Sequence, residues 1–501
     1  MSNILNTSFF IVLLLLFSIF NFIYAIDFTF DVPGSFTFSP GAIAIDNVFV
    51  GSPTVTNVNV QISVGLSIKS NFTIYSNNSV DTTLLSNDTR IDTGGGWYIG
   101  GALNTQDNFL TDSVFHLSDT GSYSGVNLVR GGCEGLQNQG SFQIEKSTFA
   151  IYGSTVNSKT MNLISSELLL AGGGNSVLDS GSTLVLTKST LKNNGPLYTV
   201  DSQITLDSES SFINNENGDV ILQNDIQLVG GDDDNQAQIL NLGLFSVEGR
   251  SPVNITVPVI NQNQFHIKQD VFISKIDSSF NMWITDNKTL STTEAVSISR
   301  GTFNGNGTVS NSLDNSATVG SHNTTSNLHI TGNYTELSNA TNILFTIANV
   351  STYSVLEIDQ NATFSGGNIT IRINQEIQEK QNVTILTHAN KQGKAPTIKI
   401  FTYNPTTGEE STPSKNCHQT EHSNSKFEVL LNFNDECTSS TSSDSGKESK
   451  GLTKAQIAGI VIGSVGAAIV ITIVVSYTLY NKYKYTQGGI SFTKKMMSLG
   501  K

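Results

Sequence analysis

Charged side chains are scarce in this chain of 501 residues. They make up 14% of the sequence, against about 25% in ordinary soluble domains. Lysine and arginine number 27 and aspartate and glutamate 41, which gives a formal net charge of −14. An acidic chain is poorly suited to bind nucleic acid or an anionic surface. We therefore expect no nucleic-acid partner.

Helical periodicity is also lacking between Ile26 and Ser440. Short runs alternate apolar and polar residues and end at Gly, Asn, Asp or Ser, which is typical of strands with one buried face. Such strands predict a sandwich, a barrel or a solenoid, so the spacing between them must decide. Clear examples are Phe142–Ile144, Leu184–Leu186, Ile204–Leu206, Leu328–Ile330 and Ile369–Ile373.

The spacing favours a solenoid. An apolar residue follows a short polar run at Phe149, Leu168, Leu191 and Phe212, at intervals of 19, 23 and 21 residues. One turn of a parallel β-helix needs about this length, and internal periods above ~20 residues indicate repeat architectures. Because a single turn cannot bury its inward side chains alone, the turns must stack. We predict a β-helix over residues 26–373.

Two long apolar runs lie near the ends of the chain. Residues 9–20 are too short to span a bilayer and are followed by a small residue, Ala25, which predicts a signal peptide over residues 1–25. Residues 455–480 carry no charge and are long enough to cross a ~30 Å hydrocarbon core. We predict that they form one transmembrane helix.

Residues 481–501 hold five lysines and no acid, as expected of a cytoplasmic tail. Lysines also precede the transmembrane helix, so the predicted orientation depends mainly on the signal peptide. We predict a single-pass type I protein of the plasma membrane with its N-terminus extracellular. Residues 438–454 are rich in serine and predict a flexible neck. Gly459 and Gly463 form a G-x-x-x-G pair through which two transmembrane helices could associate into a homodimer.

Only three cysteines are present, too few for a disulfide-based scaffold. On the oxidising side of a membrane, Cys417 and Cys437 enclose about 19 residues and form the plausible disulfide, worth about 3 kcal/mol. Cys133 is left as a buried thiol or an intermolecular link. We predict that residues 374–437, which are rich in strands, form a C-terminal β cap held by this disulfide.

The segment from Gly301 to Ile373 carries a resemblance to a known family. Its G-x-G-x-V pattern at Gly305–Val309, its G-N-Y-T at Gly332–Thr335 and the residues from Tyr353 onwards resemble the last turns of autotransporter passenger domains and related adhesins. Ser354 replaces the acid usual after the tyrosine. The resemblance implies a right-handed parallel β-helix.

The layout as a whole resembles social-amoeba type I surface proteins. These share outer regions rich in Asn, Ser and Thr, a Ser-rich neck and a membrane helix rich in Gly, Ala, Ile and Val. This resemblance implies a location at the cell surface.

Thirteen N-x-[ST] sequons lie between the two apolar runs, and none lies between about Gly95 and Pro252. In a secreted region such sites predict N-glycosylation. The predicted acceptors are Asn71, Asn77, Asn87, Asn254, Asn287, Asn306, Asn323, Asn333, Asn339, Asn349, Asn361, Asn368 and Asn382.

Candidate catalytic groups are few. Asp-Thr-Gly occurs at residues 92–94 and 119–121, and Asp-Ser-Gly at 179–181. An aspartic protease needs two such carboxylates from separate lobes sharing a proton, and these motifs lie too close in sequence for lobes to fit between them. We interpret them as turns at strand ends. The acidic run at residues 230–235 lacks the spacing of a calcium loop, so we expect no metal or cofactor.

These features predict a non-enzymatic surface protein. Its β-helical rod would present a recognition or adhesion surface for a cell-surface protein or a glycan. The alternative is a membrane-anchored enzyme acting on glycans, which would need two or three acids clustered across adjacent turns.

Overall fold

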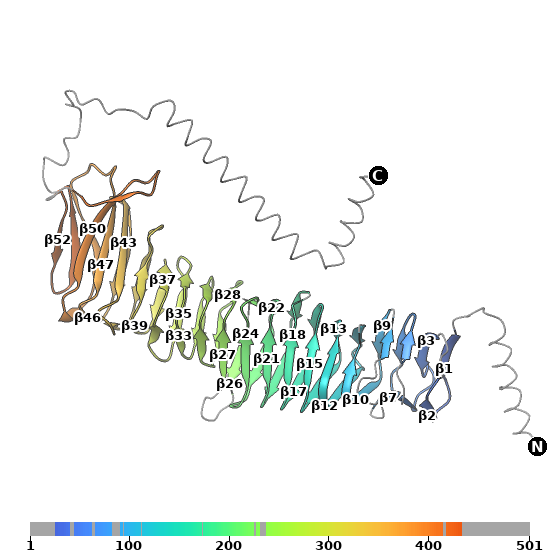
Figure 1. Cartoon of the computed structure of the whole chain (residues 1–501). Coiled ribbons are helices and arrows are strands. Elements are labelled where there is room, and N and C mark those ends of the chain that lie inside the picture. Colours follow the sequence, from blue (N-terminus) through green and yellow to red (C-terminus); the bar gives the residue numbers. More distant parts are fainter. Residues whose placement is uncertain are drawn as a thin grey trace, which may run out of the picture. The chain divides into compact units, whose positions relative to one another are not determined.

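The computed structural model describes residues 26–40, 45–62, 66–82, 91–93, 95–111, 113–172, 174–224, 227–230, 237–413 and 417–432. The chain divides into two compact units, Met1–Thr438 and Ser439–Lys501, and every described residue belongs to the first. This part of the chain is all-β and forms a parallel β-solenoid of about 14 turns (Figure 1). The predicted solenoid is therefore confirmed.

Most turns of the solenoid contribute one strand to each of three faces, which we call A, B1 and B2; in the first turns β5 (Leu66–Ile68) and β8 (Ile91–Thr93) pair within the face A sheet instead of forming face B2. Face A is a 22-stranded sheet. Its strands, in chain order, are β1 (Ile26–Phe30), β3 (Ile45–Val50), β5 (Leu66–Ile68), β6 (Phe72–Ile74), β8 (Ile91–Thr93), β9 (Gly96–Ile99), β11 (Val114–Leu117), β13 (Gly135–Asn138), β16 (Thr155–Asn157), β19 (Ser176–Leu178), β22 (Pro196–Val200), β25 (Asp219–Gln223), β28 (Leu244–Glu248), β31 (Gln264–Ile267), β34 (Met282–Ile284), β37 (Thr302–Gly305), β40 (Thr318–Gly320), β43 (Asn342–Asn349), β44 (Thr352–Tyr353), β47 (Asn368–Asn374), β50 (Thr397–Tyr403) and β51 (Glu410–Ser411).

Face B1 follows face A along the chain in each turn. Its strands are β2 (Gly34–Phe38), β4 (Val58–Ile62), β7 (Ser79–Asp81), β10 (Ala102–Leu110), β12 (Ser122–Cys133), β14 (Ser141–Glu145), β17 (Thr160–Ile164), β20 (Thr183–Thr187), β23 (Gln203–Leu206), β26 (Gln227–Gly230), β29 (Val253–Ile255), β32 (Val271–Ile273), β35 (Thr289–Thr292), β38 (Thr308–Ser310), β41 (Asn327–Ile330), β45 (Val355–Ile358), β48 (Gln381–Thr387), β52 (Gln419–His422) and β53 (Lys426–Leu431).

Face B2 completes each turn before the chain returns to face A. The last residues of β10 and β12 also pair on this face, so these two strands pass through a corner. The remaining strands are β15 (Thr148–Ile151), β18 (Glu167–Leu170), β21 (Thr190–Asn193), β24 (Ser211–Asn214), β27 (Gln238–Asn241), β30 (Val259–Asn261), β33 (Ile276–Ser278), β36 (Val296–Ile298), β39 (Leu313–Asn315), β42 (Tyr334–Glu336), β46 (Asn361–Ser365) and β49 (Asn390–Lys394).

The strand register confirms the repeat read from the sequence. Phe149 is paired with Leu168, Leu168 with Leu191, and Leu191 with Phe212 on successive strands of face B2. All four side chains are buried. Inward apolar side chains from the three faces form one continuous core along the stack, as a solenoid requires.

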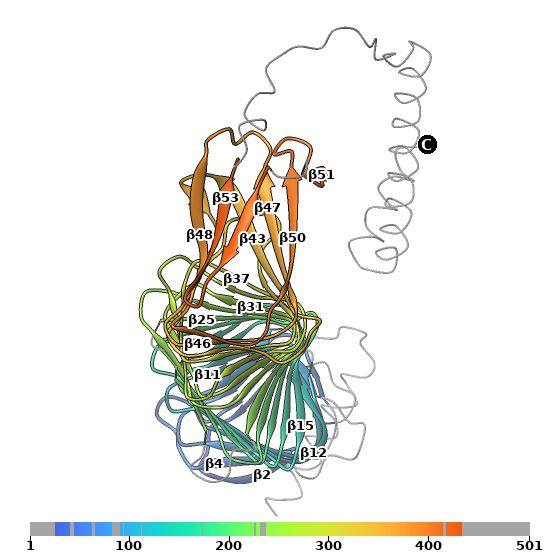
Figure 2. The same cartoon turned by 90° about the vertical axis from the view of Figure 1, so that its left-hand side faces the viewer.

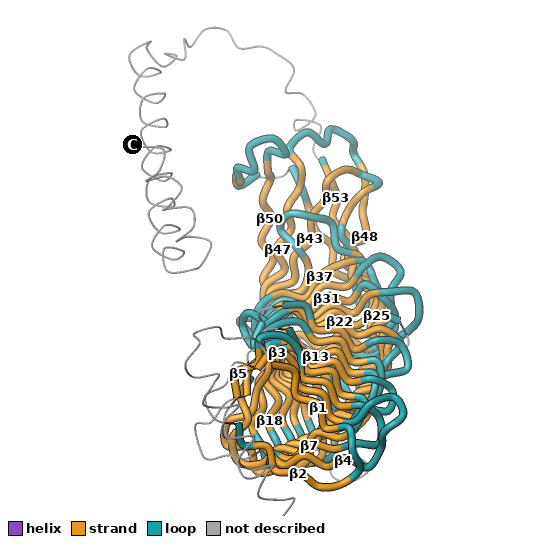
Figure 3. The backbone as a smooth tube through the Cα atoms, turned by 90° about the vertical axis from the view of Figure 1, so that its right-hand side faces the viewer, coloured by secondary structure: helices purple, strands orange, loops and turns teal. Residues whose placement is uncertain are grey.

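The short polar runs before these residues form the corner between faces B1 and B2. Lys146, Ser165 and Lys188 adopt positive φ angles of 49°, 48° and 51°, which turn the chain sharply. A buried serine follows each of them. The Ser166 N–H donates to Ser189 Oγ at 3.0 Å, and the other corner serines are linked in the same way. Figure 3 shows loops gathered along edges of the stack, between the faces formed by the strands.

Parallel pairing continues past residue 373, the predicted end of the β-helix, because β47 pairs with β50 and β46 with β49. Antiparallel strands then join the stack: β53 pairs with β48 and β52, and β51 pairs with β50. Several strands at this end are long, with eight residues in β43 and seven in each of β47, β48 and β50 (Figure 2). Whether this end acts as a cap stays a prediction.

The described residues contain no helix that is long and apolar enough to cross a membrane. The predicted signal peptide, neck, transmembrane helix and tail lie outside the described residues. Gly459 and Gly463 lie outside them too, so helix association stays a prediction.

Candidate functional site

A row of outward side chains runs along face A. On each strand the residue at this position points away from the core, and strand register places each one directly against the next. Tyr98, Val156 and Trp283 belong to this line and are 43%, 36% and 37% exposed. The members, which we call the face A row, are Tyr98, His116, Gln137, Val156, Val177, Tyr198, Ile221, Ser246, His266, Trp283 and Asn304.

The face A row contains no Asp, Glu, Lys or Arg. Six of its members are apolar or aromatic, and the others carry an imidazole, a carboxamide or a hydroxyl group. A charged pair stands beside the row, where Lys268 Nζ lies 2.6 Å from Glu248 Oε1. These two charges neutralise each other. Ser246 itself is 1% exposed, and its hydroxyl donates to Glu248 Oε1 at 2.8 Å, so the exposed part of the row is interrupted there. Uncharged surface with exposed aromatic rings, as the row has on either side of Ser246, is the kind of surface that mediates binding.

A groove of about 380 Å³ opens near one end of the row, at Tyr98. The Tyr98 and His116 rings are stacked, with centroids 4.7 Å apart and planes inclined by 6°. The imidazole is held in place because its Nδ1 lies 3.0 Å from Gln137 Oε1, to which it donates. Hydroxyl and amide groups from Thr73 and Gln139 also line this Tyr98 groove.

A larger groove of about 630 Å³ opens near the other end of the row, at Trp283. The Trp283 ring lies edge-on to His266, with centroids 5.9 Å apart. Burial, with a smaller effect of the Lys268 charge, lowers the pKa of His266, so this imidazole is neutral at pH 7. The polar groups that complete the Trp283 groove are Gln264, Asn281, Thr302, Asn304, Thr318, Ser321, His322 and Asn323.

Sequence reasoning did not find the face A row or its grooves. On its own strand each member has a buried residue on both sides, and this alternation of buried and outward residues is visible in the sequence. What was missing was the register that brings eleven separate strands into one line. The signal would have been an uncharged residue at the outward position of every successive face A strand.

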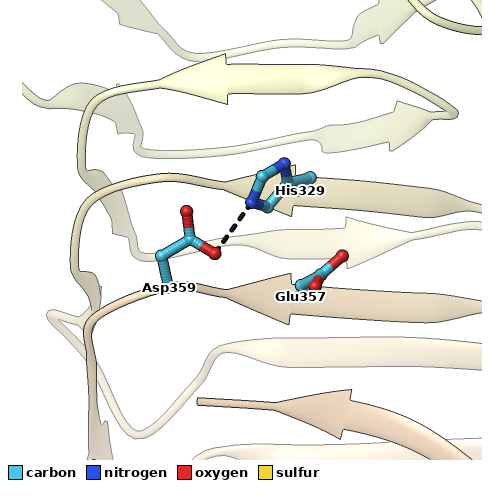
Figure 4. A group of neighbouring side chains, drawn as sticks. All are labelled: His329, Glu357 and Asp359. Atoms are coloured by element: carbon cyan, nitrogen blue, oxygen red, sulfur yellow. Dashed lines mark hydrogen bonds and ion pairs between the residues drawn. The ribbon is translucent and has the colours of Figure 1, made fainter. Parts of the chain in front are cut away.

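Face B1 carries a group of side chains that could ligate a metal ion. His329 on β41 is in register with Glu357 on β45, and Asp359 follows that strand (Figure 4). One ligand atom from each of the three lies within 4.8 Å of the others. His329 Nε2 is 2.9 Å from Asp359 Oδ1, and these side chains are 36% and 49% exposed. Water reaches both groups, and we assign the contact as a surface hydrogen bond.

The predicted glycosylation sites are accessible where they are described. None of the described sequon asparagines is buried, and Asn77, Asn254, Asn287, Asn323, Asn339, Asn349 and Asn382 are exposed. Asn87 lies outside the described residues. Asn323 lines the Trp283 groove, and Asn77 directly follows Ser76 of the Tyr98 groove.

The cysteines differ in state. Cys133 is a free, fully buried thiol, and burial raises its pKa above the usual range. The first of the two alternatives for this residue is therefore confirmed. Cys417 is disulfide-bonded. Cys437 lies outside the described residues, so the pairing of the two stays a prediction.

The Asp-Thr-Gly and Asp-Ser-Gly motifs serve the fold where they are described. Residues 119–120 and 180–181 form turns, and a side chain on Gly121 would place its Cβ 1.9 Å from the Ile99 carbonyl oxygen. Gly181 has a φ of +75°, which favours glycine. Asp92 and Thr93 instead lie within β8, so our interpretation as a turn was wrong there. Their strand, β8, pairs in parallel with β5, so these two residues are part of the sheet.

A scan against protein-family models gives no match, and no curated protein matches the sequence. The function is therefore inferred from the surface of the solenoid.

Proposed function

We propose that this chain is a single-pass type I membrane glycoprotein whose right-handed β-solenoid is a non-enzymatic recognition rod at the cell surface, acting in adhesion. The observation that carries this proposal is the face A row. An acidic protein that leaves an uncharged strip exposed along many turns has a surface suited to a partner that is itself uncharged. The repeat extends that contact along the solenoid.

The groove linings favour binding over hydrolysis. Most glycosidases use two carboxyl groups, one on each side of the scissile bond. Among the described residues that line the Tyr98 and Trp283 grooves, there is no Asp or Glu. No described group of side chains in these grooves supports the alternative, a glycan-active enzyme on this scaffold.

A charge placed in the middle of the row tests the proposal. Val177 on β19 lies in the row, and Val185 on β20 points outward from face B1 in the same turn; both are half-buried. In cells that display the full chain at equal surface density, V177K should reduce adhesion at least tenfold, because the partner would have to cover a new charge. V185K should adhere like wild type.

The comparison has a clear negative result. If V177K cells adhere as strongly as V185K and wild-type cells to every partner that wild type binds, the face A row is not the contact surface.

A further inference from the structure

We infer that the Tyr98 groove and the Trp283 groove bind neutral oligosaccharides. The inference rests on the proposed recognition function and names the ligand class. It is carried by the chemistry of the two linings, their size and their repetition along one row.

The Trp283 groove offers both kinds of contact that a sugar ring needs. The C–H face of a pyranose is apolar and stacks on an aromatic ring, and Trp283 presents such a ring with 37% of its surface exposed. Sugar hydroxyls both donate and accept hydrogen bonds. Carboxamides provide both functions, and Gln264, Asn281 and Asn304 supply three of them around the ring.

The size of each groove suits a short oligosaccharide. Sites for small ligands usually enclose about 300–1,000 Å³, and these grooves measure about 380 and 630 Å³. Both are open to one side, so a chain of sugars can extend beyond either end. The larger groove therefore accommodates more of the ligand than the smaller one.

The absence of charge selects against acidic and basic ligands. No Asp, Glu, Lys or Arg belongs to the described lining of either groove. A uronic acid or sulfated sugar would lose water from its charge and gain no cation in return. A neutral sugar has no such cost, so neutral glycans are favoured.

The same set of groups occurs twice on one line. Each groove pairs an aromatic ring with an imidazole, as Tyr98 with His116 and Trp283 with His266. Seven strand-to-strand steps separate the two imidazoles, which at about 4.8 Å each is roughly 34 Å. A long neutral polysaccharide lying along the row can occupy both grooves, and this raises its apparent affinity over that of a short oligomer.

Calorimetric titration of the full chain in detergent provides the test. The probes are cellohexaose, maltohexaose and fully N-acetylated chitohexaose, with hexagalacturonate as the acidic counterpart. At least one neutral hexamer should bind with a stoichiometry of two. The stoichiometry should fall to one in Y98A and in W283A, and binding should disappear in the double variant. F272A is the matched control, because Phe272 is a face B1 aromatic that is 36% exposed.

A second readout uses the two tryptophans of the chain. Trp97 is fully buried and Trp283 is exposed, so acrylamide quenches mainly Trp283. A bound neutral hexamer should lower this quenching at least twofold. Titrations are repeated on S79A/T325A, which lacks the sequons of Asn77 and Asn323, so glycans of the chain itself cannot fill the grooves while the groove linings are unchanged. Binding in either background supports the inference.

Three results would overturn the inference: no neutral hexamer binds in either background, hexagalacturonate binds as well as the neutral hexamers, or F272A loses binding as Y98A and W283A do. If V177K still reduces adhesion in such a case, the proposed recognition function stands and only the ligand class is wrong. If V177K leaves adhesion unchanged, the proposed function itself fails.

Discussion

Buried asparagines show how single residues hold the turns together. Asn193, Asn214, Asn241 and Asn261 occupy the last position of successive face B2 strands and are fully buried. The Asn214 Nδ2 donates to Asn241 Oδ1 at 2.8 Å and to the Gly218 carbonyl at 3.0 Å, and its Oδ1 accepts from Asn193 Nδ2 at 3.0 Å. The ladder therefore satisfies polar groups that would otherwise be buried without partners.

Removing one rung of this ladder should be costly. In N214A the amide of Asn193 and the carbonyl of Gly218 each lose one of their two partners, and we expect a loss of about 3 kcal/mol in the free energy of unfolding. Urea unfolding of the full chain measures this. The control is N162A, because Asn162 points outward from β17. A loss as small in N214A as in N162A would show that the ladder contributes little.

Two histidines meet at the C-terminal end of the solenoid, where β48 and β52 pair with β53. The Nε2 atoms of His388 and His422 are 3.5 Å apart, and His422 packs edge-on against Phe427 and Phe364. Burial, followed by the charges of Lys391 and His388, lowers the pKa of His422 to about 4. The pKa of His388 is lowered by burial and then by Lys391.

The shifted histidines predict acid-sensitive strands at this end. Because the unfolded chain binds a proton at a pKa of about 6.5 and the folded chain does so only near 4, stability should be full above pH 6.5 and fall as the pH drops towards 4. Differential scanning calorimetry should show the melting temperature falling across this window. The H388Q/H422Q variant should show a smaller drop, and parallel curves for the two chains would contradict the assignment.

At the scale of strands, the sequence predicted the inward side of the fold and missed the outward side. Inward residues such as Phe149 and Leu168 must be apolar, so their alternation and spacing are visible in the sequence. Outward residues of the face A row obey no such rule. Neighbours in the row are 17 residues apart between His266 and Trp283 and 25 apart between Ile221 and Ser246. Corner loops of unequal length cause this variation, so only the register of the folded strands reveals the row.

At the scale of the whole molecule, the sequons leave the middle of the row uncovered. Four predicted acceptors lie in the corner between faces A and B1, which borders the row: Asn77, Asn287, Asn306 and Asn323. Asn77 flanks the Tyr98 groove and Asn323 the Trp283 groove. No sequon occurs between about Gly95 and Pro252. Glycans would thus border the ends of the row and leave Gln137 to Ile221 accessible to a partner.

The fold also predicts which sequons carry glycans. Asn287 is exposed at a turn, with a φ of 58°. Asn361 is half-buried in a ladder, where its Nδ2 donates to Asn333 Oδ1 and its Oδ1 accepts from Asn390 Nδ2, each at 3.2 Å. A sugar on Asn361 Nδ2 would displace the Asn333 contact, and chains so modified would fold poorly.

Peptide mapping of surface-displayed chains after enzymatic deglycosylation in heavy-oxygen water should therefore label Asn287 nearly completely and Asn361 at most weakly. Equal labelling of the two would show that this ladder does not restrict glycosylation.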